Sequence, residues 1–290
     1  MRTVEDFQEY QILDMANGQK LEKWNDIFLI RPDPQIIWPE PIFKEKWKKA
    51  DAIYHRSTSG GGSWEIKKKI PTPFYVHYQD LTFCLKLMGF KHTGLFPEQA
   101  TNWNLLRKVI QKEARPLRVL NLFAYTGAAS VVALNAGASV VHVDSSKGMV
   151  EWAKENVLVN HLQDKPIRFI VDDCLKFVKR EIRRGNTYDI ILMDPPSFGR
   201  GSKKEVWTIE EKLYELVNLC TELMSEKFVL FLINSYSTGL SKTVLENLLY
   251  LTVNKKKNGK ISSDEIGIKM RDYPLILPCG VTAIWHDKKY

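Results

Sequence analysis

The chain has 290 residues, a formal net charge of +8 and a pI of about 9.1. No apolar run reaches the roughly 20 residues that a membrane-spanning helix needs, and residues 1–30 lack the basic-then-apolar pattern of a secretory signal. The four cysteines form no CxxC pair, so neither a zinc site nor a disulfide framework is indicated. We therefore expect a cytoplasmic globular protein without a metal and without a membrane partner.

Lysines gather in short runs, among them Lys67–Lys69 and Lys255–Lys257. If such runs lie on one face, they would attract nucleic acid, because bound phosphates release counterions. Ordinary solvated surface lysines explain the charge equally well. Composition alone leaves both interpretations open.

Residues 1–75 differ in composition from the rest, since they combine four tryptophans with turn-forming prolines and a glycine run at 60–62. Short strands are predicted at 26–30 and 63–66. The glycine run predicts a turn and not a phosphate cradle, because no Lys-Ser/Thr pair follows it. We expect a small β-rich N-terminal region over 1–75 that shapes the substrate site or forms a homodimer contact.

From Leu117 onward, apolar runs alternate with helical stretches. Strands are predicted at 117–123, 139–144, 167–172, 188–193 and 228–235, and helices at 128–136, 147–160, 175–184, 209–224 and 242–253. Repeated strand–helix units indicate a parallel sheet flanked by helices. Strands at 273–277 and 281–285 are predicted to pair antiparallel through a turn at 278–280. We expect residues 76–290 to form an α/β domain, a doubly wound Rossmann-like sheet with an antiparallel edge.

The fourth of these strands ends abruptly in Asp194-Pro195-Pro196. Proline has no N–H for the sheet ladder and fixes its own φ, so the strand must stop there. Ligands of open α/β sheets bind in the crevice beyond the carboxyl ends of the strands. The motif is therefore expected to form a rigid polar ledge beside a pocket, able to present carbonyls to an amine or a base.

Three other strand ends indicate which cofactor the pocket takes. The first carries only Gly127, whereas dinucleotide binders use G-x-G-x-x-G to approach a pyrophosphate. The second ends in Asp144, whose carboxylate can accept both hydroxyls of a ribose. The third ends in Asp172-Asp173-Cys174, suited to the adenine amine. An adenosine cofactor without pyrophosphate fits this set, and S-adenosylmethionine is the natural candidate.

Taken in order, the segments NLFAYTG, VDSSKGMVEWAKENVLVN, VDDC and MDPPSF resemble the class I S-adenosylmethionine-dependent methyltransferases. More narrowly, they are similar to bacterial 23S ribosomal RNA methyltransferases that modify cytosine C5 or guanine N7. The upstream run at 89–99, which contains Phe96 and Pro97, is similar to a segment of that family that contacts the cofactor. The resemblance covers residues 75–290 and implies an enzyme with an RNA substrate.

The resemblance also implies roles for individual residues. Those expected to bind the methionine end of the cofactor are Asn121, Phe123, Ala124, Tyr125, Thr126 and Gly127. Asp144 would bind the ribose with Ser145 beside it, and Asp173 would face the adenine with Asp172 and Cys174 as neighbours. The expected catalytic set is Asp194, Pro195, Pro196, Ser197 and Phe198, with Asp194 and Pro195 bordering the transferring methyl. The alternatives are a helix-cap or surface role for Asp144 and Asp194, and exchange of roles between Asp172 and Asp173.

The chain departs from the family pattern in two places. Cytosine C5 methylation needs a cysteine thiolate to add to the ring, and the resemblance places it after the fifth strand, where residues 232–239 contain none. The aromatic residue of amino-group methylases follows the second proline directly, whereas Ser197 precedes Phe198 here. Phe198 is left with two interpretations, stacking on a flipped base or packing of the loop. A nitrogen acceptor is favoured, because it needs no covalent catalyst.

Three hypotheses follow. The first is methyl transfer from S-adenosylmethionine to a nitrogen of ribosomal RNA. The second is a methyltransferase for a small molecule or a protein that uses the same site. The third is a non-catalytic RNA-binding protein that retains a relic pocket.

Overall fold

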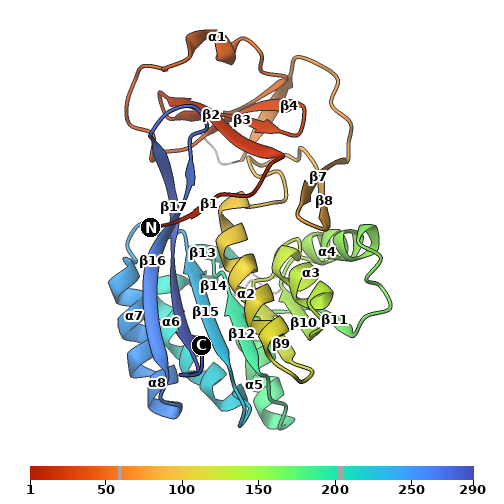
Figure 1. Cartoon of the computed structure of the whole chain (residues 1–290), viewed down its shortest axis with the longest axis vertical. Coiled ribbons are helices and arrows are strands. Elements are labelled where there is room, and N and C mark those ends of the chain that lie inside the picture. Colours follow the sequence, from red (N-terminus) through yellow and green to blue (C-terminus); the bar gives the residue numbers. More distant parts are fainter. Residues whose placement is uncertain (58–60, 201–205) are drawn as a thin grey trace. The chain divides into compact units, whose positions relative to one another are not determined.

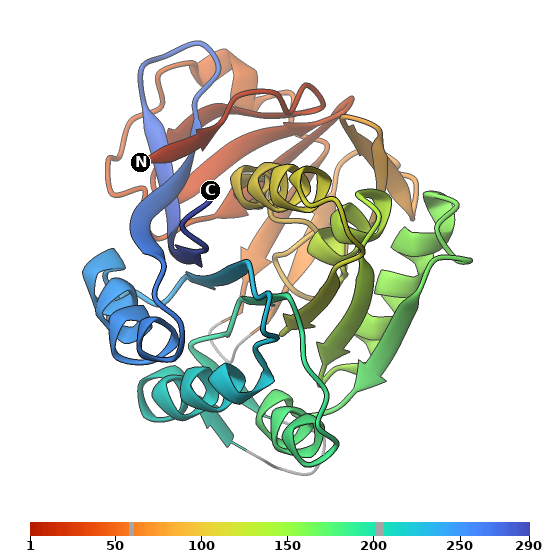
Figure 2. The same cartoon turned by 60° about the horizontal axis from the view of Figure 1, so that its bottom comes forward.

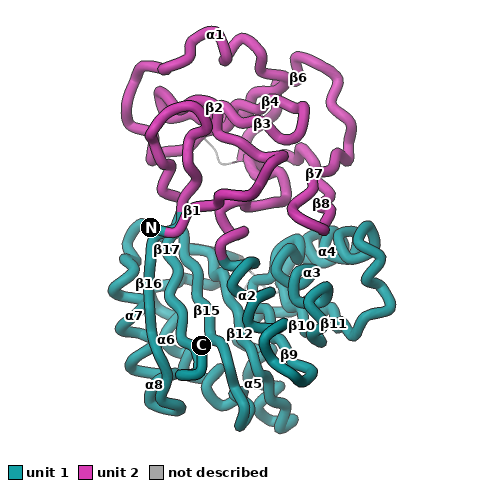
Figure 3. Tube along the Cα trace, in the orientation of Figure 1, with its two compact units in different colours: residues 1, 102–266, 280–290 teal, residues 2–101, 267–279 magenta. Residues whose placement is uncertain are grey.

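The computed structural model describes residues 1–57, 61–200 and 206–290, with only the backbone of Arg200 included. Within these residues the chain divides into two compact units (Figure 3). Unit 1 comprises residue 1 and residues 102–266 and 280–290, and unit 2 comprises residues 2–101 and 267–279. The expected domain boundary at residue 75 stays a prediction, whereas the compact units divide at residue 101. Gly60 of the glycine run lies outside the described residues.

Unit 1 is built on a mainly parallel sheet (Figure 1). Along the sheet, its strands are β16 (Lys260–Lys269), β17 (Ile276–His286), β15 (Leu230–Ser235), β12 (Ile190–Met193), β9 (Arg118–Leu122), β10 (Ser139–Asp144) and β11 (Ile167–Val171). The five from β15 to β11 pair in parallel, and β17 pairs antiparallel with β15. This confirms the predicted doubly wound sheet. The chain adds β10 and β11 on one side of β9 and then returns to place β12 on its other side. Ligands are therefore expected at the carboxyl ends of β9 and β12, where the strand order reverses.

Helices cover both faces of this sheet (Figure 2). The helices and short 3-10 turns of the unit are α2 (Ala100–Lys112), α3 (Ala128–Asn135), α4 (Lys147–Val159), α5 (Cys174–Arg183), α6 (Ile209–Cys220), η2 (Thr221–Leu223), α7 (Lys242–Leu251) and α8 (Val253–Lys256). Three helices begin at a residue whose side chain caps the first turn, namely Ser146 before α4, Asp173 before α5 and Ser241 before α7. These caps set where the helices leave the strand ends.

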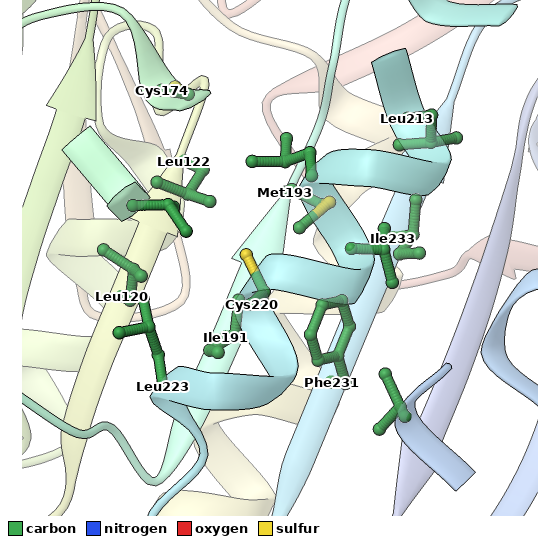
Figure 4. Packing of buried hydrophobic residues seen from close by; sticks show 14 of the residues in the cluster. Leu120, Leu122, Cys174, Ile191, Met193, Leu213, Cys220, Leu223, Phe231 and Ile233 are labelled. Carbon is green, nitrogen blue, oxygen red and sulfur yellow. The ribbon is translucent and has the colours of Figure 1, made fainter. Parts of the chain in front are cut away.

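The main core of unit 1 lies between the sheet and helices α5, α6 and α7. Alternate residues of each strand point to this face, because side chains in a strand alternate sides. Figure 4 shows this packing, with the strand residues Leu120, Leu122, Ile191, Met193, Phe231 and Ile233 beside the helix residues Cys174, Leu213 and Cys220. Burial of these apolar side chains therefore stabilises β9, β12 and β15, at whose ends the site is expected.

The predicted turn at Pro278-Cys279-Gly280 is wrong. Residues 276–286 form the single strand β17, and the chain reverses before it, between β16 and β17. Gly280 has a different task, because a Cβ there would lie 2.8 Å from the carbonyl oxygen of Ser235. The glycine allows β17 to approach β15 closely, a requirement that the sequence pattern does not distinguish from a turn.

Unit 2 contains the β-rich region expected at the N-terminus. Its described elements are β1 (Arg2–Val4), β2 (Tyr10–Ala16), β3 (Gln19–Trp24), β4 (Ile27–Pro32), α1 (Lys44–Trp47), β5 (Ala52–Arg56), β6 (Gly62–Ile66), β7 (Phe74–Tyr78), β8 (Leu81–Leu85) and η1 (Pro97–Gln99). Strands β2 to β6 form one sheet in chain order, and β7 pairs with β8. Within the five-stranded sheet, Glu22 on β3 is fully buried and forms an ion pair with Arg31 on β4. Burial alone would raise the pKa of Glu22, but the attraction of Arg31 lowers it to about 2.

Candidate functional site

The loop after β9 is a tight turn that is hydrogen-bonded to strand β10 and helix α4. Phe123, Tyr125 and Gly127 have φ angles of 53°, 51° and 83°. The N–H of Ala124 donates to the Val143 carbonyl at 3.0 Å, and the side chain of Asn156 donates to the Thr126 carbonyl at 2.8 Å. Three positive φ angles in five residues are costly unless the surroundings impose them. The turn from 123 to 127 is therefore a preformed feature of the site.

Gly127 is required at the end of this turn. It has no Cβ, and a Cβ would lie 2.8 Å from the Cβ of Ala153 on α4. The carbonyl of Gly127 accepts the N–H of Val131 at 2.9 Å, so α3 begins here. The close approach of α3 and α4 brings the turn beside the end of β10, where Asp144 lies.

Asp144 is oriented by the backbone on both of its oxygens. Oδ2 accepts the N–H of Tyr125 at 2.9 Å, and Oδ1 accepts the N–H of Ser146 at 2.8 Å. The N-cap of α4 is Ser146 and not Asp144, which separates the carboxylate from a capping role. Burial raises the pKa of Asp144. Each carboxylate oxygen has a second lone pair, so Asp144 can still accept a pair of hydroxyls.

Asn121, which the sequence assigned to the cofactor, points into the interior on the opposite face from the main core. Its Nδ2 donates to Ser130 Oγ at 3.0 Å, and that oxygen lies 3.0 Å from His142 Nδ1. Burial lowers the pKa of His142 to about 3, so the ring is neutral at neutral pH. This buried network supports the turn from behind, at the junction of β9, β10 and α3.

The three residues that follow β11 are already engaged within the protein. Asp173 caps α5 by accepting the N–H of Lys176 at 2.9 Å. Asp172 accepts the N–H of Asp173 at 2.9 Å and forms an ion pair with Arg180. Cys174 is buried, and its Sγ accepts the N–H of Phe123 at 3.3 Å. The cysteine therefore ties the turn to α5, and burial raises the pKa of its thiol.

The Asp194-Pro195-Pro196 ledge continues into a short hairpin. Strand β13 (Phe198–Arg200) pairs antiparallel with β14 (Val206–Thr208). Trp207 Nε1 donates to the Pro196 carbonyl at 2.6 Å, and the N–H of Ile209 donates to the Ser197 carbonyl at 3.0 Å. These contacts use the carbonyls of the second proline and of the serine, so the hairpin stiffens the ledge.

Two side chains of the ledge have different surroundings. Phe198 is 56% exposed, which agrees with a surface available for stacking better than with loop packing. Ser197 Oγ lies 2.7 Å from Ser237 Oγ.

The ring of Trp207 packs against Phe123 with centroids 4.8 Å apart, so it joins the ledge to the turn after β9. Both ends of the expected site, from β9 and from β12, are thereby brought together.

Asp194 receives a hydrogen bond that the sequence reasoning missed. Asn234 Nδ2, at the end of β15, donates to Asp194 Oδ1 at 3.1 Å. The signal was a polar residue directly after the apolar run Phe231–Ile233, within the predicted strand 228–235 and next to the expected sheet edge. Trp207 was missed as well, because the hairpin β13–β14 has no clear sequence pattern.

Phe96 and Pro97 belong to unit 2. Pro97 begins η1, and the ring of Phe96 lies 5.0 Å from that of His92. Desolvation lowers the pKa of His92 to about 3. The proposed contact of this segment with the cofactor stays a prediction.

The described residues contain no cluster of three or more His, Cys, Asp or Glu side chains arranged to hold a metal ion. In the same part of the chain, no helix is both long and apolar enough to cross a membrane.

Comparison with known proteins decides the family. A family model of S-adenosylmethionine-dependent methyltransferases matches residues 54–246. The chain belongs to this family. The SAM-dependent methyltransferase of Agrobacterium tumefaciens is 36% identical and superposes with a TM-score of 0.92 over 98% of this chain and 92% of that one. SMU.776, solved in complex with SAH, shares the fold with a TM-score of 0.73 at 21% identity, over 97% of this chain and 76% of that one. The family membership confirms the resemblance to class I methyltransferases.

Sequence relatives of this chain include the ribosomal RNA large subunit methyltransferase K/L of two Shewanella species. The protein from Shewanella frigidimarina is 36% identical over 204 residues, which are 69% of this chain and 26% of that protein. The protein from Shewanella baltica strain OS155 is 40% identical over 124 residues, or 42% of this chain and 16% of that protein. The chain thus spans only about a quarter or less of the length of these relatives.

Proposed function

We propose that this protein transfers a methyl group from S-adenosylmethionine to a nitrogen atom of ribosomal RNA. The observation that carries the proposal is the segment after β12, where Asp194 directly follows the strand and the ring of Phe198, four residues later, is 56% exposed. An acid can hold a nitrogen-bound hydrogen of the acceptor, and an exposed ring can stack on a base taken out of its helix. Asp-Pro-Pro fixes both on one short segment.

The cysteines of unit 1 support a nitrogen rather than a carbon acceptor. Cys174 and Cys220 are both buried, and burial raises the pKa of each thiol. Methylation of a pyrimidine carbon needs an attacking thiolate, and these thiols are held in the protonated, unreactive form. A nitrogen lone pair needs no such covalent help.

The residues of unit 1 fit the adenosine part of the cofactor. Asp144 would accept the ribose hydroxyls, Asp173 the adenine amine, and the turn from 123 to 127 would face the methionine end. When bound, S-adenosylmethionine supplies a methyl group activated by a sulfonium. The fit rests on the chemistry of these groups, since Asp144 is a backbone-oriented acceptor next to a turn with preset φ angles.

The protein would then act by orientation. Asp194 would accept the N–H of the acceptor and direct the nitrogen lone pair toward the methyl group, while Phe198 would hold the base in place. As the new N–C bond forms, the C–S bond breaks, and the proton of the acceptor nitrogen leaves to Asp194 or to water. Catalysis would then come from the alignment of the acceptor nitrogen, the methyl carbon and the sulfonium sulfur.

The names of the Shewanella relatives support RNA as the substrate, and the net charge of +8 agrees with a phosphate-rich partner. A ribosomal RNA substrate would agree with a cytoplasmic protein. A homodimer contact through the N-terminal region stays a prediction, which light scattering of the purified protein would check.

The deciding experiment is transfer of labelled methyl groups into ribosomal RNA from a strain that lacks the gene, followed by nucleoside analysis. We expect an N-methylated nucleoside, a strong loss of activity in Asp194→Ala, and activity close to that of the unmodified protein in Cys220→Ser. Label in a small molecule or a protein would support the second hypothesis instead. Salt-dependent RNA binding without turnover, unchanged by Asp194→Ala, would support the relic pocket.

A further inference from the structure

A chain of hydrogen-bonded polar side chains runs from helix α2 through strands β17 and β15 to Asp194. Asn102 on α2 donates to Thr282 Oγ1 at 3.2 Å, and Thr282 donates to Asn234 Oδ1 at 2.7 Å. Asn234 Nδ2 then donates to Asp194 Oδ1 at 3.1 Å. All four residues belong to unit 1. We call Asn102, Thr282 and Asn234 the relay.

The direction of the relay is fixed by its chemistry. A threonine hydroxyl has a single hydrogen, and because Thr282 accepts from the Asn102 amide it gives that hydrogen to Asn234. Asn234 must therefore present its carbonyl oxygen to Thr282 and its NH₂ group to Asp194. The amide cannot flip without placing two acceptors, Asn234 Oδ1 and Asp194 Oδ1, against each other.

The relay is also too deeply buried to be an accident of the surface. Asn234 is 1% and Thr282 0% exposed, and the two residues face each other in register on β15 and β17. An apolar pair at these positions would cost no desolvation, whereas buried polar groups destabilise the fold unless they are paired. A directed network of buried hydrogen bonds that ends at the residue after β12 points to a role in orienting Asp194.

We propose that Asn234 is a positioning residue, held by Thr282 and Asn102, that fixes the Asp194 carboxylate as a hydrogen-bond acceptor facing the transferring methyl group. The inference rests on the proposed function in one respect, the place of Asp194 beside the methyl. It adds that the orientation of Asp194 is set from β17, a strand that carries none of the expected site residues. Without the relay, Asp194 would remain but would turn away from its productive direction.

The test compares two ligands and needs no methyl acceptor. S-adenosylhomocysteine lacks the methyl, and sinefungin carries a protonated amine on the carbon that replaces the sulfonium. Isothermal titration gives the ratio of their dissociation constants, which reports a carboxylate beside the methyl position. We expect Thr282→Val to reduce the preference for sinefungin by about threefold or more, and Thr282→Ser, which keeps the hydroxyl, to restore it. Thr282→Ala replaces the valine variant if that one does not fold.

The matched control is Thr221→Val, which removes another buried hydroxyl of unit 1, one bonded to the Asn218 carbonyl at 2.6 Å. It should lower thermal stability similarly and leave the ligand ratio unchanged. In an Asp194→Asn background, Thr282→Val should add nothing, because the relay acts only through Asp194. A full additional effect there, or an unchanged ratio in Thr282→Val alone, overturns the proposal.

The two conclusions fail in different ways. If no RNA is methylated but the ligand ratio responds as described, the RNA substrate is wrong and the relay stands. If RNA is methylated and the ratio does not respond, the relay is wrong and the function stands. Absence of binding of both ligands by the unmodified protein overturns both.

Discussion

Gly127 carries two separate constraints that substitution can distinguish. Gly127→Ala places a Cβ on a residue with φ of 83° and within 2.8 Å of Ala153 Cβ, whereas Gly137 has φ of 98° with nothing within 4 Å. A positive φ alone costs alanine about 1–2 kcal/mol, and overpacking adds about 1–3 kcal/mol. We therefore expect Gly127→Ala to destabilise the protein clearly more than Gly137→Ala in urea unfolding. Equal losses would show that α4 yields at Ala153.

If Asp144 binds the ribose as proposed, its protonation links cofactor binding to pH. Burial raises its pKa above the ordinary 3.8, so the folded protein holds this proton more tightly than the unfolded chain does. The protonated carboxyl therefore contributes to the free energy of unfolding at low pH, and this contribution is lost as the pH rises through the pKa of the folded protein. Over the same pH range the carboxylate forms, which can accept the ribose hydroxyls. We expect the affinity for S-adenosylhomocysteine to fall on acidification at a higher pH than an unperturbed aspartate would allow.

Titration of Asp144→Asn provides the comparison. The amide keeps the shape and one acceptor oxygen, and loss of a charged hydrogen bond should weaken binding by about 1.5–3 kcal/mol at neutral pH. Its binding should also lose the acid limb. An acid limb of the same midpoint in Asp144→Asn would assign the titration to another group.

At the scale of elements, the start of α5 combines a structural and a proposed binding role. Asp173 caps the helix, so Asp173→Ala should lower the free energy of unfolding by about 1 kcal/mol. Asp173→Ser keeps a capping oxygen but removes the carboxylate, and should retain stability. If Asp173 also binds the adenine amine, both variants should bind S-adenosylhomocysteine more weakly. Unchanged affinity in the serine variant would leave Asp173 with its cap alone.

The elements also show what sequence patterns can and cannot specify. The alternation of apolar strands and helices predicted the parallel strands from β9 to β15, because β9, β10, β12 and β15 are mostly buried. The ends of β17 were misplaced, since Pro278 and Gly280 are typical of turns. Only the facing carbonyl of Ser235, distant in sequence, explains the glycine.

Some residues of the candidate site could be predicted from the sequence and others could not. Asp144, Asp194 and the turn after β9 were identifiable because they follow strands within short motifs. Asn234 and Thr282 were not, since their pairing depends on the register of two strands about fifty residues apart in the chain. The capping role of Asp173 was not predicted, since a helix cap was an alternative only for Asp144 and Asp194.

At the scale of the whole molecule, the net charge of +8 predicts that the proposed binding of RNA depends on the salt concentration. Binding to ribosomal RNA fragments should weaken by at least about tenfold between roughly 50 and 200 mM salt, because bound phosphates release counterions. Affinity for S-adenosylhomocysteine, measured on the same samples, should change little. Filter binding and titration calorimetry would give both values. RNA binding that ignores salt would argue against a basic contact surface.

The antiparallel strand β17 has a consequence for the order in which the protein can be made. β15 has every residue buried, and β17 covers one of its edges with residues that follow about fifty positions later in the chain. Until those residues leave the ribosome, β15 presents an open, apolar edge of the kind that recruits other strands. The nascent chain therefore passes through an aggregation-prone stage that ends when β17 inserts. The same insertion delivers Thr282, so protection of the sheet and alignment of Asp194 are completed in one step.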